Sequence, residues 1–252
     1  MHLSRSTTHT VWDNAIEPVA TVPPGETVTI EVANSSGGQI IRDSTVDAVT
    51  NLNFDNVNPV TGPLAVVGAE PGDSIVVDII DIDVDTWGWT AAIPGFGLLA
   101  DHFPEPHLRI STITRADVEF LPCLHLPAVP MIGTIGLAPA EPGPAPMVPP
   151  HRGGGNMDIR HVTAGARLLL PVAVAGGLLS VGDTHAAQGD GEVCGTGRRA
   201  RWSRSASVST RRVGFLRVHG VRPPLRHRRI GLQLQQQRAR GAAVSCPGGR
   251  FC

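Results

Sequence analysis

The sequence predicts a mainly β fold, a barrel-like or sandwich assembly of hairpins with few short helices. First, residues 27–32 alternate apolar and polar side chains, as a half-buried strand does. Second, this segment and the turn before it return at residues 71–78 and, more weakly, at 163–170. Third, 22 prolines and 29 glycines among 252 residues interrupt helical apolar spacing, which disfavours a doubly wound α/β fold.

Further strands are predicted, in chain order, at residues 64–67, 131–136 and 168–174. The second of these lies within a proline-rich stretch, residues 122–150, which is otherwise typical of an extended ordered loop or a lid. Aromatic residues lie beside glycines at residues 87–97, where they line either the mouth of a pocket or the core.

Charge divides the chain into two parts. Residues 1–197 contain 7 arginines and all 22 acidic residues, whereas residues 198–252 contain 14 arginines and no acidic residue. We therefore predict a β domain over 1–197 and an arginine-rich, disordered tail over 198–252. All 21 basic residues are arginine, and the lack of lysine excludes Schiff-base chemistry and a Walker A loop.

Composition also bears on location and partners. No apolar run is long enough to span a bilayer, so we expect no membrane partner. The first ten residues, MHLSRSTTHT, lack the apolar centre of a secretion signal, and the four cysteines form no C-x-x-C pair. We therefore expect a cytoplasmic protein without a zinc ribbon or a thioredoxin motif.

The densest group of polar side chains lies in residues 182–197, GDTHAAQGDGEVCGTG. Asp183 and His185 are two residues apart on a predicted strand, so they share one face. Asp190 and Glu192 have the same relation on a second strand after a turn, and both pairs could face one point. Carboxylates around an imidazole suit a divalent cation with a bound water. A glycine-rich hairpin without metal is the alternative.

Two other glycine-rich segments contain candidate site residues. In residues 151–158, Asn156 and Asp158 are two apart, which predicts a shared face, and a hairpin could bring Asp158 toward Asp183. In residues 36–39, the backbone amides and Gln39 either face a ligand or belong to a mobile loop.

Six motifs follow one another in the first 197 residues: VWDN from residue 11, SGGQ from 36, GAEPGD from 68, IPGFG from 93, GGNMD from 154 and GDTHAAQGDGE from 182. In this order they resemble the acetamidase/formamidase family, and the last motif is the most specific. The resemblance implies a β-rich, homo-oligomeric, cytoplasmic hydrolase. Such an enzyme splits small amides, formamide or acetamide, to the carboxylate and ammonia with a divalent metal, zinc.

The resemblance also implies roles by motif position. Asp158, Asp183 and His185 would be metal ligands or residues that support the ligands, and His185 would also take part in catalysis. Glu192 or Asp190 would be a ligand or the general base. The substrate pocket would contain four further residues: Gln39, Asn156, Gln188 and Cys194.

The chemistry of amide cleavage agrees with a metal. An amide is a poor electrophile, so it needs a strong nucleophile and a polarised carbonyl, and a metal ion supplies both. A nearby carboxylate then carries the proton. Attack by Cys194 with His185 as its base is the alternative mechanism. Without lysine, the Ser-Ser-Lys and Glu-Lys-Cys arrangements of other amidases are excluded.

After residue 197 the family pattern stops. We interpret residues 198–252 as the translation of a shifted reading frame, which would leave the chain weakly active or a non-catalytic remnant. An arginine-rich arm that binds nucleic acid is the other interpretation. It is disfavoured, because the tail offers only Trp202, Phe215 and Phe251 for base stacking.

Overall fold

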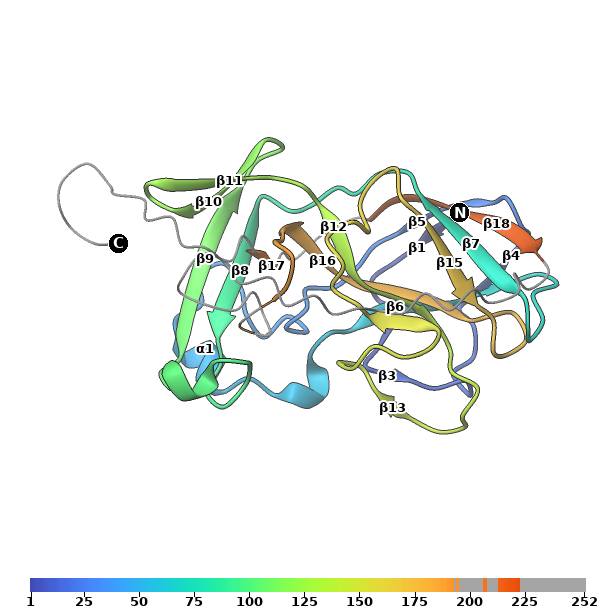
Figure 1. Ribbon diagram of the computed structural model, residues 1–252, viewed down its shortest axis with the longest axis horizontal. Coiled ribbons are helices and arrows are strands. Elements are labelled where there is room, and N and C mark those ends of the chain that lie inside the picture. Colours follow the sequence, from blue (N-terminus) through green and yellow to red (C-terminus); the bar gives the residue numbers. More distant parts are fainter. Residues whose placement is uncertain (193, 195–205, 208–212, 223–252) are drawn as a thin grey trace.

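The computed structural model describes residues 1–192, residue 194, and residues 206–207 and 213–222. Within these residues the protein is mainly β, as predicted, and its larger sheet curls into a half-barrel (Figure 1). The one α-helix of this part is α1 (Asp47–Thr50), and two 3-10 turns, η1 (Phe54–Asn56) and η2 (Ala100–His102), complete the helical content. None of its helices is long and apolar enough to cross a lipid bilayer.

The smaller sheet collects the three recurring turn–strand units. Its order is β1-β5-β18-β7-β15, and the units end in β5, β7 and β15. β18 comes from the arginine-rich tail and pairs with β5 and β7, so this part of the tail is a strand. Residues 206–207 of the tail are described as well, and the rest of the predicted disordered tail lies outside the described residues. The bounds are β1 His2–Leu3, β5 Thr27–Ile30, β7 Ser74–Ile79, β15 Arg167–Pro171 and β18 Val213–Arg222.

The larger sheet has the order β11-β10-β9-β8-β17-β16-β12-β14, and β6 extends it by pairing with β16, β2 and β4. β3 (Val11–Trp12) and β13 (Ala145–Pro146) form a separate pair. The bounds in the larger sheet are β2 Thr8–His9, β4 Ala20–Val22, β6 Val60–Val66, β8 Trp87–Ala92, β9 His107–Ile113, β10 Asp117–Leu121, β11 Leu124–Pro127, β12 Met131–Leu137, β14 Gly154–Asn156, β16 Leu179–Ala187 and β17 Ala206–Ser207.

The main hydrophobic core joins the two sheets. Val28 and Val77 of the smaller sheet belong to the same buried cluster as Ile135 and Val181 of the larger one. Each fully buried side chain of this kind stabilises the fold by about 1.5–3 kcal/mol. All residues of β12 and β16 are buried, so these two central strands form a rigid platform.

The sequence-predicted strands are found, with changed ends. The short buried strand expected at 131–136 is β12, and the strand expected at 168–174 is β15, which already ends at Pro171 because proline lacks an amide donor. The proline-rich stretch 122–150 contains β11, β12 and β13 rather than one long loop. Trp89 lies in the core beside Ile40, so here the aromatic residues serve packing.

Candidate metal centre

Three ligand-type side chains meet beside the central strands of the larger sheet. Asp183 and His185 come from β16, and Asp158 follows β14. Each offers one ligand atom, and these atoms all lie within 4.8 Å of one another. His185 Nε2 lies 3.2 Å from Asp183 Oδ1 and 3.8 Å from Asp158 Oδ1. This group, called the ligand group below, could hold a divalent metal ion.

The ligand group is largely buried, and four of its polar atoms form no hydrogen bond with the described residues. His185 is fully buried and Asp183 is 7% exposed. Asp158 Oδ1, Asp183 Oδ1 and both ring nitrogens of His185 are enclosed without a hydrogen bond from any described residue. Buried polar atoms are normally hydrogen-bonded, because desolvating them otherwise costs several kcal/mol. A cation at this point would satisfy the two carboxylates and one ring nitrogen together, so the residues present fit a metal.

The backbone takes up unusual conformations to bring the two carboxylates together. Asp158 has φ 47° and Asp183 has φ 43°, in the left-handed region that non-glycine residues rarely occupy. Such residues cost about 1 kcal/mol or more each, and the surrounding structure must hold them. The amide of Asp158 donates to the carbonyl of Gly133 at 3.1 Å, which fixes the loop after β14 against β12.

Glu192 approaches the ligand group from the other side of the imidazole. Its Oε1 lies 3.5 Å from His185 Nδ1, and its side chain is 12% exposed. His185 therefore has carboxylates at both ring nitrogens. A carboxylate at the nitrogen that faces away from a metal is the usual support of a metal-binding histidine.

The crowding of carboxylates shifts the protonation of the group. Burial raises the pKa of Asp158 to about 8, and the charges of Glu192 and Asp183 add to this rise while His185 opposes it. For His185, burial lowers the pKa, but the carboxylates of Asp183 and Glu192 outweigh burial and raise it to about 10. Without a metal, protons compensate the negative charge at this point. A divalent cation would replace them.

Comparisons with known proteins identify the family of the chain. The pattern of the Acetamidase/Formamidase family matches residues 1–146 and 142–202. The chain belongs to the acetamidase/formamidase family. It is 30% identical to a formamidase from Methylophilus methylotrophus and 32% identical to an acetamidase from Mycolicibacterium smegmatis, in each case over 74% of this chain. The chain spans about 60% of the length of these curated relatives.

Solved structures of an acetamidase and of a gamma lactamase share the fold. The acetamidase of Bacillus halodurans is 34% identical, with a TM-score of 0.77 over 89% of this chain and 72% of that protein. A gamma lactamase from Delftia acidovorans is 26% identical, with a TM-score of 0.75 over 86% of this chain and 64% of that protein. Both likenesses show that the chain shares its fold with these two proteins.

Within this family framework, the expected second strand after β16 is not formed. β16 continues to Ala187, and residues 188–192 form no strand, so Asp190 and Glu192 do not share a face. The side chain of Asp190 is 84% exposed and forms an ion pair with Arg160 Nε at 2.9 Å. The structure thus brings Glu192 to the ligand group and leaves Asp190 at the surface.

Asn156 and Asp158 also lie on different sides of the sheet. Asn156 Oδ1 accepts hydrogen bonds from Thr134 Oγ1 at 2.6 Å and from Asn58 Nδ2 at 2.9 Å. Asp158 instead lies over Gly133, the neighbour of Thr134, and adjacent residues of a strand face opposite sides. The prediction that Asn156 and Asp158 share a face is wrong. The strand β14 ends at Asn156, and the chain then turns through Asp158, which has a left-handed backbone conformation.

The other predicted pocket residues have different surroundings. Gln188 Nε2 donates to the backbone carbonyl of Asp158, so Gln188 contacts the loop that carries a ligand. Cys194 is half-buried two residues after Glu192. The side chain of Gln39 is tied to Asn53, whose amide donates to Gln39 Oε1 at 2.8 Å. Pocket roles for these residues remain predictions.

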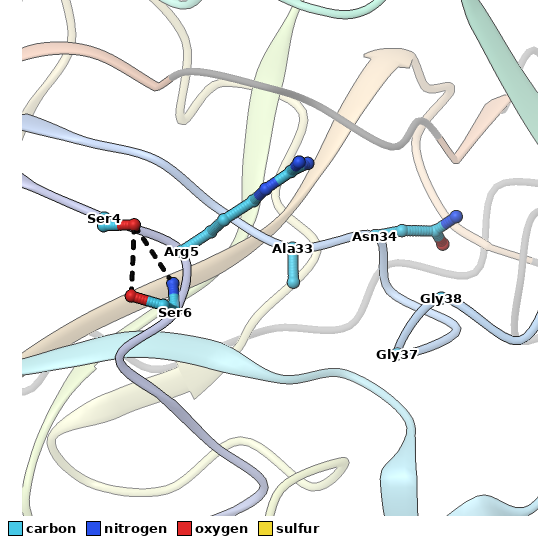
Figure 2. Close-up of a pocket in the computed structure, with 7 residues that line it drawn as sticks. All are labelled: Ser4, Arg5, Ser6, Ala33, Asn34, Gly37 and Gly38. Atoms are coloured by element: carbon cyan, nitrogen blue, oxygen red, sulfur yellow. Dashed lines mark hydrogen bonds between the residues drawn. The ribbon is translucent and has the colours of Figure 1, made fainter.

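The glycines before Gln39 line an open hollow of about 410 Å³ (Figure 2). Arg5 supplies the one charged side chain of its lining, and none of the lining residues belongs to the ligand group. The residues that line it are Ser4, Arg5, Ser6, Ala33, Asn34, Gly37 and Gly38. The expected ligand-facing loop at residues 36–39 therefore borders a hollow that does not include the ligand group.

Proposed function

We propose that this chain hydrolyses short aliphatic amides, formamide or acetamide, to the carboxylate and ammonia at a zinc ion held by Asp158, Asp183 and His185. The buried ligand group with its unsatisfied oxygen and nitrogen atoms carries the proposal. Membership of an amidohydrolase family supports the reaction class. Two relatives are named formamidase and acetamidase, which supports small amides as substrates.

When bound, the metal would activate a water as nucleophile and polarise the amide carbonyl. Asp158 and Asp183 would supply the negative charge that holds a cation in a largely buried site, where the Asp158 side chain remains 21% exposed. Glu192 Oε1, 3.5 Å from His185 Nδ1, would keep the ring proton on Nδ1, so that the lone pair of Nε2 faces Asp158 and Asp183 when a metal is bound. The resemblance implies Glu192 or Asp190 as the general base; Asp190 faces solvent, whereas Glu192 lies at Nδ1, on the side of the ring away from the metal position, so Glu192 would act on the proton transfer through His185.

Two alternatives are kept for testing, one in mechanism and one in function. Cys194 would attack the carbonyl in a metal-independent reaction with His185 as base. A non-catalytic remnant is the second alternative, because the family pattern of the sequence stops after residue 197. A homo-oligomeric, cytoplasmic enzyme without nucleic-acid or membrane partners remains part of the proposal.

Ammonia release from formamide and acetamide by the full 252-residue chain tests the function. We expect a strong chelator to stop the release, zinc to restore it, and His185→Ala to remain inactive with zinc present. Release that persists with chelator and stops in Cys194→Ser would support the cysteine mechanism. Zinc-loaded chain that releases no ammonia from either amide would contradict the proposed activity.

A further inference from the structure

Gly133 lies directly beneath the ligand group. In β12, Ile132 pairs with Thr184 and Thr134 pairs with Gly182, so Gly133 lies opposite Asp183 on β16. A Cβ added at Gly133 would lie 2.7 Å from Asp158 Oδ1, 2.9 Å from His185 Nε2 and 2.9 Å from the carbonyl oxygen of Asp183. Carbon atoms make non-bonded contacts at about 3.5–4.0 Å, so all three contacts are too short for a side chain.

Other glycines of the central strands are required for a different reason. An added Cβ at Gly136 would meet the backbone of Gly155, and one at Gly182 would meet the carbonyl oxygen of Pro59. Those positions allow strands and loops to pack closely. At Gly133 the neighbours include two ligand-type side chains, and its φ lies outside the left-handed region. Residue 133 must therefore be glycine because a side chain would fill the space above its Cα, and not because of its backbone conformation.

That space coincides with the position a metal would take. Asp158 Oδ1 and His185 Nε2 are 3.8 Å apart, and their midpoint would lie about 2 Å from the added Cβ. Zinc binds carboxylate oxygen and imidazole nitrogen at about 2.0–2.2 Å, so an ion between these two atoms lies near that midpoint. A methyl group at residue 133 and a metal ion cannot occupy this volume together.

We propose that Gly133 is a positioning residue of the metal centre, in two ways. Its missing side chain leaves the volume that the ion occupies. Its carbonyl accepts the amides of Met157 at 3.0 Å and Asp158 at 3.1 Å, which fixes the left-handed conformation of Asp158 beside that volume. The inference rests on the proposed function only in placing a metal at the ligand group.

Gly133→Ala in the full chain tests the inference, with bound zinc per chain as the readout. Gly191→Ala is the matched control, because a Cβ there has nothing within 4 Å and its φ is not left-handed. We expect Gly133→Ala to lower zinc affinity at least 100-fold, while Gly191→Ala binds zinc as the wild type does. Circular dichroism with chelator present shows whether both variants keep the wild-type fold. Equal zinc affinity in Gly133→Ala and wild type would overturn the inference.

A second measurement does not depend on the variant folding. In crystals of the zinc-loaded wild-type chain, the anomalous peak of zinc should lie within about 4 Å of Gly133 Cα, beside Asp158 and His185. A zinc peak elsewhere would overturn the inference. Zinc bound at this position without amide turnover would contradict the proposed function and leave the role of Gly133 intact.

Discussion

Replacing Asp158 with asparagine should stabilise the metal-free chain at alkaline pH and destroy the metal site. Burial, aided by the charge of Glu192, raises the pKa of Asp158 from 3.8 to about 8. Between these values the folded chain keeps a proton that the unfolded chain has released. Since the folded state then binds more protons, the free energy of unfolding falls as pH rises through this window.

The size of the effect follows from the pKa. A pKa rise of about four units corresponds to a loss of about 6 kcal/mol in the free energy of unfolding once the pH exceeds both pKa values of Asp158. Partial screening of the side chain by solvent reduces this loss to about 3–6 kcal/mol. His185 adds a loss of the same sign between pH 6.5 and about 10, because its charged form is favoured in the folded state. Asp158→Asn removes the loss of stability that comes from Asp158 and leaves part of the loss that comes from His185.

Urea unfolding with a chelator at pH 5.5, 7 and 8.5 measures this dependence. The wild type should lose stability across the series, Asp158→Asn should lose clearly less, and Asp190→Asn, at an exposed carboxylate, should follow the wild type. Added zinc should raise the stability of the wild type most at the highest pH, where fewer protons compete, and should leave Asp158→Asn unchanged. If the free energy of unfolding fell with pH equally steeply in the wild type and in Asp158→Asn, the reasoning would be refuted.

Other substitutions separate the roles within the site. Glu192→Gln should weaken zinc binding about 10–100-fold, measured by calorimetry, and reduce ammonia release by at least about 100-fold in an ammonia assay. If both values are unchanged, Glu192 is not part of the site. Asp190→Asn should change stability by less than about 1 kcal/mol and leave turnover intact, and a tenfold loss would identify Asp190 as the base. Cys194→Ser should keep full turnover, whereas an inactive variant would favour thiol attack.

Residue spacing predicted the part of the ligand group that lies on one strand. Asp183 and His185 are two apart in a buried strand, and they do meet, although Asp183 itself has φ 43°, which the spacing did not predict. The same rule failed for Asn156 and Asp158, because the left-handed turn at Asp158 follows the end of β14 and no local pattern announces it. It failed also beyond Ala187, where the expected second strand is an irregular segment.

Long-range placement could not be read from the sequence. Gly133 was visible only as a glycine in a short buried strand, and its position under the ligand group depends on the register of β12 with β16. The ion pair that draws Asp190 to the surface depends on Arg160, 30 residues earlier in the chain. The all-β class, in contrast, follows from local alternation and turn residues, which is why the turn–strand units of β5, β7 and β15 were predicted.

The zinc content of the purified, zinc-loaded and dialysed chain, measured by elemental mass spectrometry beside Asp183→Asn, tests the metal centre most directly. We expect about one zinc per chain in the wild type and none in Asp183→Asn, since one ion fits the three ligand atoms. Equal zinc in both proteins, or none in the wild type, would contradict a metal held by Asp158, Asp183 and His185.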